Sequence, residues 1–208
     1  MEIKAELKQP YTEQEKINFI VEQNHKLGYI IEKLEDKLVA FGYTEQEKLQ
    51  KENKRIALLK MTGADVERAI YKVKGIDFDD ILAMVKDDPA IDEKALKIEF
   101  KANNFYRGNP YISQVGLLLG FTEGMLDKFF ETKDYQYLTK KTLTINAVPK
   151  EAKVIIEGIE IDKVTAPYGT DIEYSVELEG YTNYYGEVNL VEDKVIDVEL
   201  KEVKTTEV

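Results

Sequence analysis

The sequence predicts an α+β protein: a mostly α-helical N-terminal part with a small β-hairpin or sheet, followed by a C-terminal antiparallel β-sandwich. Two periodicities and the boundary between them support this prediction. Through much of residues 44–137, apolar residues recur at three- and four-residue spacing. From Thr142 onward they alternate with polar residues. The boundary falls within Asp134–Thr142, and Thr139–Thr142 contains no Gly or Pro, which indicates a short, restrained connection.

Length and composition limit the kind of protein. The 208 residues suffice for two small domains, and 43% hydrophobic residues suffice for their cores. With 33% charged residues and no apolar run of about 18 residues, we expect a soluble chain without a membrane span. The segment Met1–Glu6 carries acidic residues where a secretory signal has basic ones, so nothing in it directs export. The absence of cysteine excludes disulfides and thiolate sites.

The acidic charge lies mostly in the C-terminal part. The net charge is −11, and residues 141–208 contribute −8 of it, with fifteen Asp and Glu against seven Lys and Arg. Nucleic-acid affinity comes largely from Lys and Arg that displace counterions from phosphates. An acidic surface repels phosphates, so we expect no nucleic-acid binding by this part.

Residues 1–43 are predicted to form a small strand–helix–hairpin element. A strand at the N-terminus is followed by a helix over 13–26 that ends before Gly28. The segment 29–41 fits a helical stripe or a hairpin. We favour the hairpin, because the polar segment 35–37 separates two apolar runs.

One hexapeptide, Tyr-Thr-Glu-Gln-Glu-Lys, occurs at 11–16 and again at 43–48. In each copy a Thr is followed three residues later by a Glu, the pattern of a capping box at the start of a helix. A recognition tag would also explain a repeat. The capping interpretation accounts for the Thr and the Glu by themselves, so we favour it.

Residues 44–137 are predicted to form a compact helical bundle. Polar residues that favour the N-cap position mark the helix starts, and Gly or Pro marks several of the ends. We expect the helix that contains Phe100 to stop near residues 106–108. The predicted starts are Thr44, Thr62, Asp77, Asn109 and Thr122.

Residues 141–201 are predicted to form a sandwich of six or seven short strands. Turn signals at Pro149, Gly158, Gly169, Gly180 and Gly186 separate the alternating runs. The polar segment 202–208 is expected to be a frayed tail.

The titratable residues give little indication of catalysis. His25 is the only histidine, and it lies near a helix end, where its charged form would interact favourably with the helix dipole. A group of aspartates could bind a hard cation, but its spacing matches no calcium loop, and helix capping explains Asp77. This group is Asp77, Asp79, Asp80, Asp87 and Asp88. We therefore expect a non-enzymatic protein with no catalytic, cofactor-binding or metal site.

The segment 110–130 has the layout of a helix-turn-helix, with two short helices joined through Leu119–Thr122. The second helix, 123–131, contains three acidic residues and one lysine. A DNA-reading helix normally presents basic or amide side chains, so we favour a helix hairpin used for packing.

Tyrosines are the notable excess of the C-terminal part. Buried phenols need hydrogen-bond partners, so these tyrosines cannot all belong to the core. Exposed tyrosines can stack on sugars or anchor a protein interface, although several could simply cover strand pairs. The candidate interaction surface consists of Tyr168, Tyr174, Tyr181, Tyr184 and Tyr185.

Two resemblances bear on function. The segment from Ala152–Gly158 through Thr165–Gly169 to Tyr174–Tyr181 resembles PEGA-type and related Ig-like repeats over about 60 residues. It departs from the PEGA pattern at Glu151, where that family has Gly. The N-terminal part, about 130 residues, looks like small proteins encoded near tail genes by tailed phages and prophages of gut Firmicutes. The residues that carry this second resemblance are 10–16, 24–28, 42–48 and 105–110.

Together these resemblances imply a virion structural protein, made in the host bacterial cytoplasm, that serves as a capsid, neck or tail decoration or as a fibre-like component. The helical part would dock on other virion proteins, and the sandwich would face a host-surface glycan or protein. Homo-oligomerisation would follow from the symmetry of virions. The alternatives are a phage DNA-binding or regulatory protein that uses segment 110–130, and a tail-fibre assembly factor.

Overall fold

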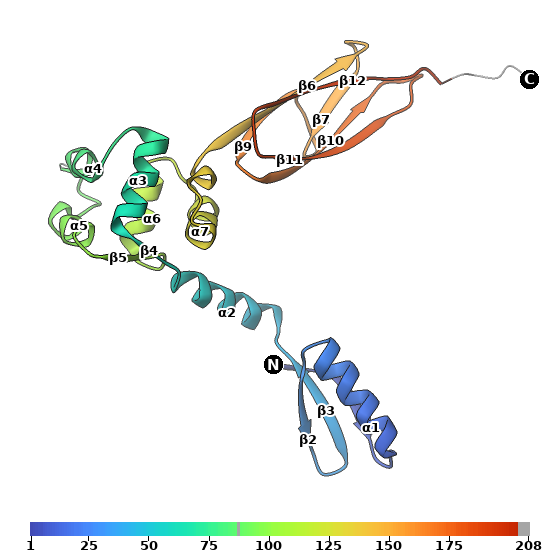
Figure 1. The fold of residues 1–208 in the computed structure, drawn as a ribbon. Coiled ribbons are helices and arrows are strands. Elements are labelled where there is room, and N and C mark those ends of the chain that lie inside the picture. Colours follow the sequence, from blue (N-terminus) through green and yellow to red (C-terminus); the bar gives the residue numbers. More distant parts are fainter. Residues whose placement is uncertain (87, 204–208) are drawn as a thin grey trace, which may run out of the picture. The chain divides into compact units, whose positions relative to one another are not determined.

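The computed structural model describes residues 1–86 and 88–203, and it is α+β with several antiparallel sheets. The chain divides into two compact units, Met1–Ala57 and Leu58–Val208, each of which is described by itself (Figure 1). No helix within the described ranges combines the length and apolar character that a membrane crossing requires.

The first unit contains a three-stranded antiparallel sheet in the order β1-β3-β2. Strands β2 and β3 form the hairpin favoured for 29–41, and the alternative helix is wrong, because the polar residues between the apolar runs form the turn. The core is small and lies on the central strand, where Leu38, Val39 and Ala40 are buried. Its elements are β1 (Glu2–Lys8), α1 (Glu13–Ile20), the π-helix η1 (Val21–Lys26), β2 (Ile30–Lys33), β3 (Lys37–Gly42) and α2 (Glu45–Ala57).

Both copies of the hexapeptide start helices through the predicted capping boxes. The Thr12 backbone N donates to the Glu15 carboxylate at 2.7 Å, and the Glu15 backbone N donates back to the Thr12 hydroxyl at 3.2 Å. Thr44 and Glu47 repeat the pattern at 2.9 and 3.2 Å. Hydrogen bonds from the N-terminal ammonium and from the Thr44 backbone lower the pKa of Glu47 to about 2. Helix α2 lies in the first compact unit, which extends to Ala57. It is thus separate from the bundle that was predicted to start at residue 44.

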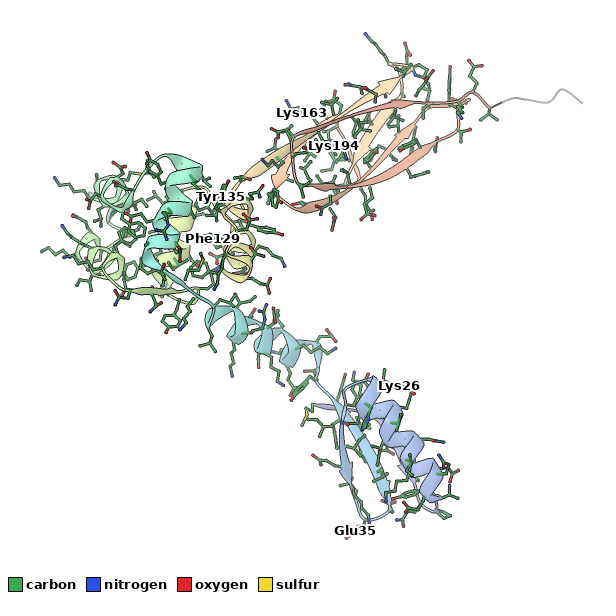
Figure 2. The ribbon with its side chains drawn as sticks, viewed as in Figure 1. Lys26, Glu35, Phe129, Tyr135, Lys163 and Lys194 are labelled. Atoms are coloured by element: carbon green, nitrogen blue, oxygen red, sulfur yellow. The ribbon has the colours of Figure 1, made fainter. Side chains whose placement is uncertain are left out.

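The second unit begins with a helical part around one hydrophobic core. Cap residues start four of its helices at predicted positions: Thr62, Asp77, Asn109 and Thr122 each accept a backbone hydrogen bond in the first turn. The helix that begins at Glu93 is capped by Asp92, which was not predicted. Figure 2 shows Phe129, one of the fully buried residues, within this part. The elements are β4 (Lys60–Thr62), α3 (Gly63–Lys74), α4 (Phe78–Val85), α5 (Glu93–Phe100), β5 (Asn104–Tyr106), α6 (Pro110–Leu118), α7 (Glu123–Thr132) and the 3₁₀ helix η2 (Tyr135–Leu138).

One predicted helix end is wrong. Helix α5 stops at Phe100, and Asn104–Tyr106 forms strand β5, which pairs with β4. A three-residue strand has no periodicity of its own, and this one exists because its partner strand lies about 45 residues earlier in the chain. The pairing brings Phe105 into the core, where its ring lies 5.6 Å from that of Phe78.

The second unit continues with seven strands, here called the β module (residues 140–199). Two sheets, in the orders β11-β10-β7-β8 and β12-β6-β9, share one hydrophobic core. The pairing is antiparallel except that β12 runs parallel to β6, which the sequence pattern did not predict. The strands are β6 (Lys140–Val148), β7 (Lys153–Ile156), β8 (Ile159–Glu160), β9 (Lys163–Pro167), β10 (Thr170–Glu177), β11 (Tyr184–Leu190) and β12 (Lys194–Glu199). Of the tail predicted to fray, 204–208 lies outside the described residues.

Two glycines of the helical part allow a matched test of its packing. A Cβ on Gly116 in α6 would lie 2.5 Å from Leu126 Cδ1, whereas a Cβ on Gly124 in α7 would meet nothing within 4 Å. We expect Gly116→Ala to destabilise the protein by about 1–3 kcal/mol through overpacking. Gly124→Ala should stabilise it by up to about 1 kcal/mol through helix propensity. Urea unfolding measures both, and equal effects would contradict the close contact of α6 with α7.

Candidate interaction surface

The five candidate tyrosines do not form one cluster. Tyr168 precedes β10 and Tyr181 follows it, so the two lie at opposite ends of that strand. The ring of Tyr168 packs edge-on against Tyr137 at 5.1 Å, and the hydroxyl of Tyr181 donates to Glu202 at 3.2 Å. Both residues are therefore occupied by contacts within the chain.

Tyr174 lies in the core, because β10 turns it inward together with Ile172 and Val176. It is 7% exposed and stacks on Tyr184, with ring centroids 6.0 Å apart. Its ring takes the space over Gly186, where an added Cβ would lie 2.4 Å from the Tyr174 Cζ. Burial, and then the hydrogen bond with Tyr184, raises the pKa of Tyr174 to about 12.

Tyr184 is 43% exposed, and Tyr185, the most exposed of the five candidates, is 70% exposed. Tyr185 pairs with Ser175 of β10, and Ser175 pairs with Ile155 of β7, so the three residues form a row across the four-stranded sheet. This row lies on the outer face, because its neighbours Tyr174 and Val176 point into the core.

A second row beside it is acidic. Glu173 of β10 stands directly opposite Glu187 of β11. Glu157, at the end of β7, accepts the backbone N–H of Glu173 at 2.7 Å and has a φ of 51°, which is uncommon for a residue other than Gly. The two rows line an open hollow of about 570 Å³ on the outer face.

The acidic row has no counter-ion within the described part of the chain: neither Glu157, Glu173 nor Glu187 forms an ion pair with a described Lys or Arg. Like charges directly opposite each other on paired strands destabilise a sheet. The outer-face patch, defined as Ile155, Glu157, Glu173, Ser175, Tyr185 and Glu187, is therefore both exposed and electrostatically unfavourable.

The segment 110–130 consists of two helices, α6 and α7, as predicted. Its acidic residues, Glu123 and Asp127, form ion pairs with Arg107. Arg107 is 6% exposed; it donates to Ser113 at 3.1 Å, pairs with Glu123, and its Nε lies 2.7 Å from Asp127.

The one lysine of α7, Lys128, pairs with Glu131 at 3.1 Å. The charges of α7 thus serve packing and local pairing, which does not favour contact with DNA.

Sequence reasoning missed Arg107. A signal was present: Glu123 and Asp127 are four residues apart, so they lie on one side of a helix and can share a cation.

The other titratable candidates that the structure describes lie in helix ends and turns and do not form a site. His25 lies in η1, Asp77 and Asp80 form a capping box, and Asp88 accepts from the Ala90 backbone at 2.8 Å, whereas Asp87 lies outside the described residues. Residues 1–86 and 88–203 contain no cluster of His, Cys, Asp and Glu suited to a metal ion.

Comparisons with family models, with curated proteins and with solved structures return no match for this chain.

Arg107 and its partners should respond unequally to substitution. In Arg107→Met the two carboxylates stay partly hydrated, so we expect a loss of about 1–2 kcal/mol. Glu123→Gln with Asp127→Asn leaves a buried guanidinium without a counter-ion, and we expect the free energy of unfolding to fall by about 3–5 kcal/mol. Chemical denaturation measures both. A larger loss of stability in Arg107→Met than in the double variant would contradict the assignment of Arg107 as the buried charge.

Tyr174 should make stability depend on alkaline pH. In the unfolded chain a tyrosine loses its proton near pH 10, whereas folded Tyr174 keeps its proton up to about 12. Between these values the folded state binds more protons, so stability falls as pH rises. Tyr174→Phe removes this contribution, and we expect a shallower loss of stability over the same interval in urea unfolding at stepped pH. Superimposable profiles would contradict the burial of this phenol.

Proposed function

We propose that this chain is a non-enzymatic structural protein of a phage particle, in which the helical part docks on other virion proteins and the β module is presented outward for protein contact. The β module is taken to be an Ig-like, PEGA-like sandwich. Two sheets around one core, in a stretch of about 60 residues, support that fold.

The observation that carries the proposal is the outer-face patch. An open hollow on the face of a sheet suits the surface of another macromolecule, whereas small-molecule sites usually enclose most of their ligand. Exposed tyrosines are enriched where proteins contact each other. The polar cluster around Arg107, in contrast, is engaged in joining α6 to α7.

The layout of the second unit supports a division between docking and presentation. One hydrophobic core ends at Leu138 and the next begins at Leu143. Strand β6 begins at Lys140, directly after Thr139, and the Thr139 carbonyl accepts the backbone N–H of Tyr168 at 3.0 Å. Two separate cores in one unit allow one part to dock and the other to be presented.

Mass spectrometry of purified particles from a strain that encodes the chain tests the proposal. We expect the chain in the particles at a fixed ratio to a shell or tail protein, as repeated parts of a symmetric assembly require. Antibodies raised against the β module should bind intact particles. Absence from the particles would overturn the proposal, and presence in the lysate alone would indicate the assembly factor instead.

A further inference from the structure

We propose that the outer-face patch binds a basic protein segment, one that carries at least two Lys or Arg side chains. This inference deepens the proposed function and rests on it for the outward presentation of the β module. Its ligand chemistry, in contrast, follows from the patch itself.

The outer face of the four-stranded sheet carries closely spaced negative charges. Glu157, Glu173 and Glu187 form an acidic row across three neighbouring positions, two of them directly opposite each other. All three are exposed, and none is paired with a described cation. A cationic partner would relieve their repulsion, so its binding gains an interaction that the free protein lacks.

The spacing of these carboxylates decides which kind of cation they can bind. A metal ion needs ligands that converge within about 2.0–2.6 Å of one point. Within the described ranges no set of acidic side chains is placed for that, and neighbouring strands hold residues about 4.8 Å apart. Separate carboxylates on one face of a sheet fit separate ammonium or guanidinium groups.

Tyr185 adds an aromatic surface beside the carboxylates. Its exposed ring stands in the row next to the acidic row, together with Ile155 and Ser175. An aromatic face attracts Lys and Arg cations, and their aliphatic stems can pack on the ring and on Ile155. An anionic partner such as a phosphate backbone would meet three carboxylates here and be repelled.

Lysine side chains already lie over tyrosine rings at two other places in the chain. Lys51 lies over the ring of Tyr43 at 3.4 Å, and Lys72 lies 4.6 Å from the ring centroid of Tyr135. In the outer-face patch no described lysine occupies the equivalent place over Tyr185. The geometry thus leaves that place to a partner.

The test is a binding titration on the full-length chain. The probe is a short fluorescein-labelled peptide of alternating lysine and threonine, and the reference probe replaces each lysine with glutamate. Fluorescence anisotropy at low salt should show saturable binding of the lysine peptide alone, weakened as salt is added.

Two variants of the patch and one matched control locate the binding. We expect Glu173→Gln with Glu187→Gln to weaken it by about five- to tenfold, and Tyr185→Ser by about two- to fivefold. The control, Glu192→Gln with Glu199→Gln, removes the same charge from exposed positions outside the patch and should bind within about twofold of the unchanged chain.

A second readout separates this role from a structural one. Removing the repulsion in Glu173→Gln with Glu187→Gln should raise the melting temperature by about 1–4 °C while binding weakens. A lower or unchanged melting temperature would contradict the charge conflict and overturn the argument for a cationic partner.

Besides that melting-temperature result, two binding results would overturn the inference: no saturable binding of the lysine peptide, whether or not a neutral oligosaccharide binds, and equal weakening in the matched control. Such a failure leaves the presence of the chain in particles unaffected. Conversely, absence from particles leaves the peptide affinity unaffected, so the two proposals can fail separately.

Discussion

The two-residue period of β10 is the constraint on which both the fold and the proposed surface of the β module depend. Ile172, Tyr174 and Val176 point inward and are buried, so the residues between them must point outward. One strand therefore supplies the centre of the core and the centre of the outer-face patch. A one-residue shift in its register would exchange the two sets.

The inner face of this sheet is stabilised by packing, whereas the outer face carries a destabilising pair of like charges. Inside, Gly186 leaves room for the Tyr174 ring, and the pairing serves packing. Outside, Glu173 stands opposite Glu187, an arrangement that costs stability. Real proteins tend to break local rules where function requires it, so the unfavourable pair is the feature of this face that most needs a partner.

The helical part shows the opposite use of charge. Arg107, Glu123 and Asp127 have partners within the fold, and the pairing lowers the pKa of Glu123 chiefly through its hydrogen bond from Arg107. Charges that looked like poor DNA contacts in the sequence are thus structural. Acidic side chains join two helices where a buried arginine lies within reach. In the outer-face patch, acidic side chains have no described cation to pair with.

The sequence alone determined the local elements: the two capping boxes, the cap-marked helix starts and the change of periodicity near Thr142. Each of these depends on residues close together in the chain, so local chemistry suffices. Tertiary structure alone decided that Phe105 lies on a strand, that β12 runs parallel to β6, that Tyr174 is buried while Tyr185 is exposed, and that Arg107 lies between two acids. These depend on partners 16 to about 50 residues away, and a single strand's pattern does not say which face meets the core.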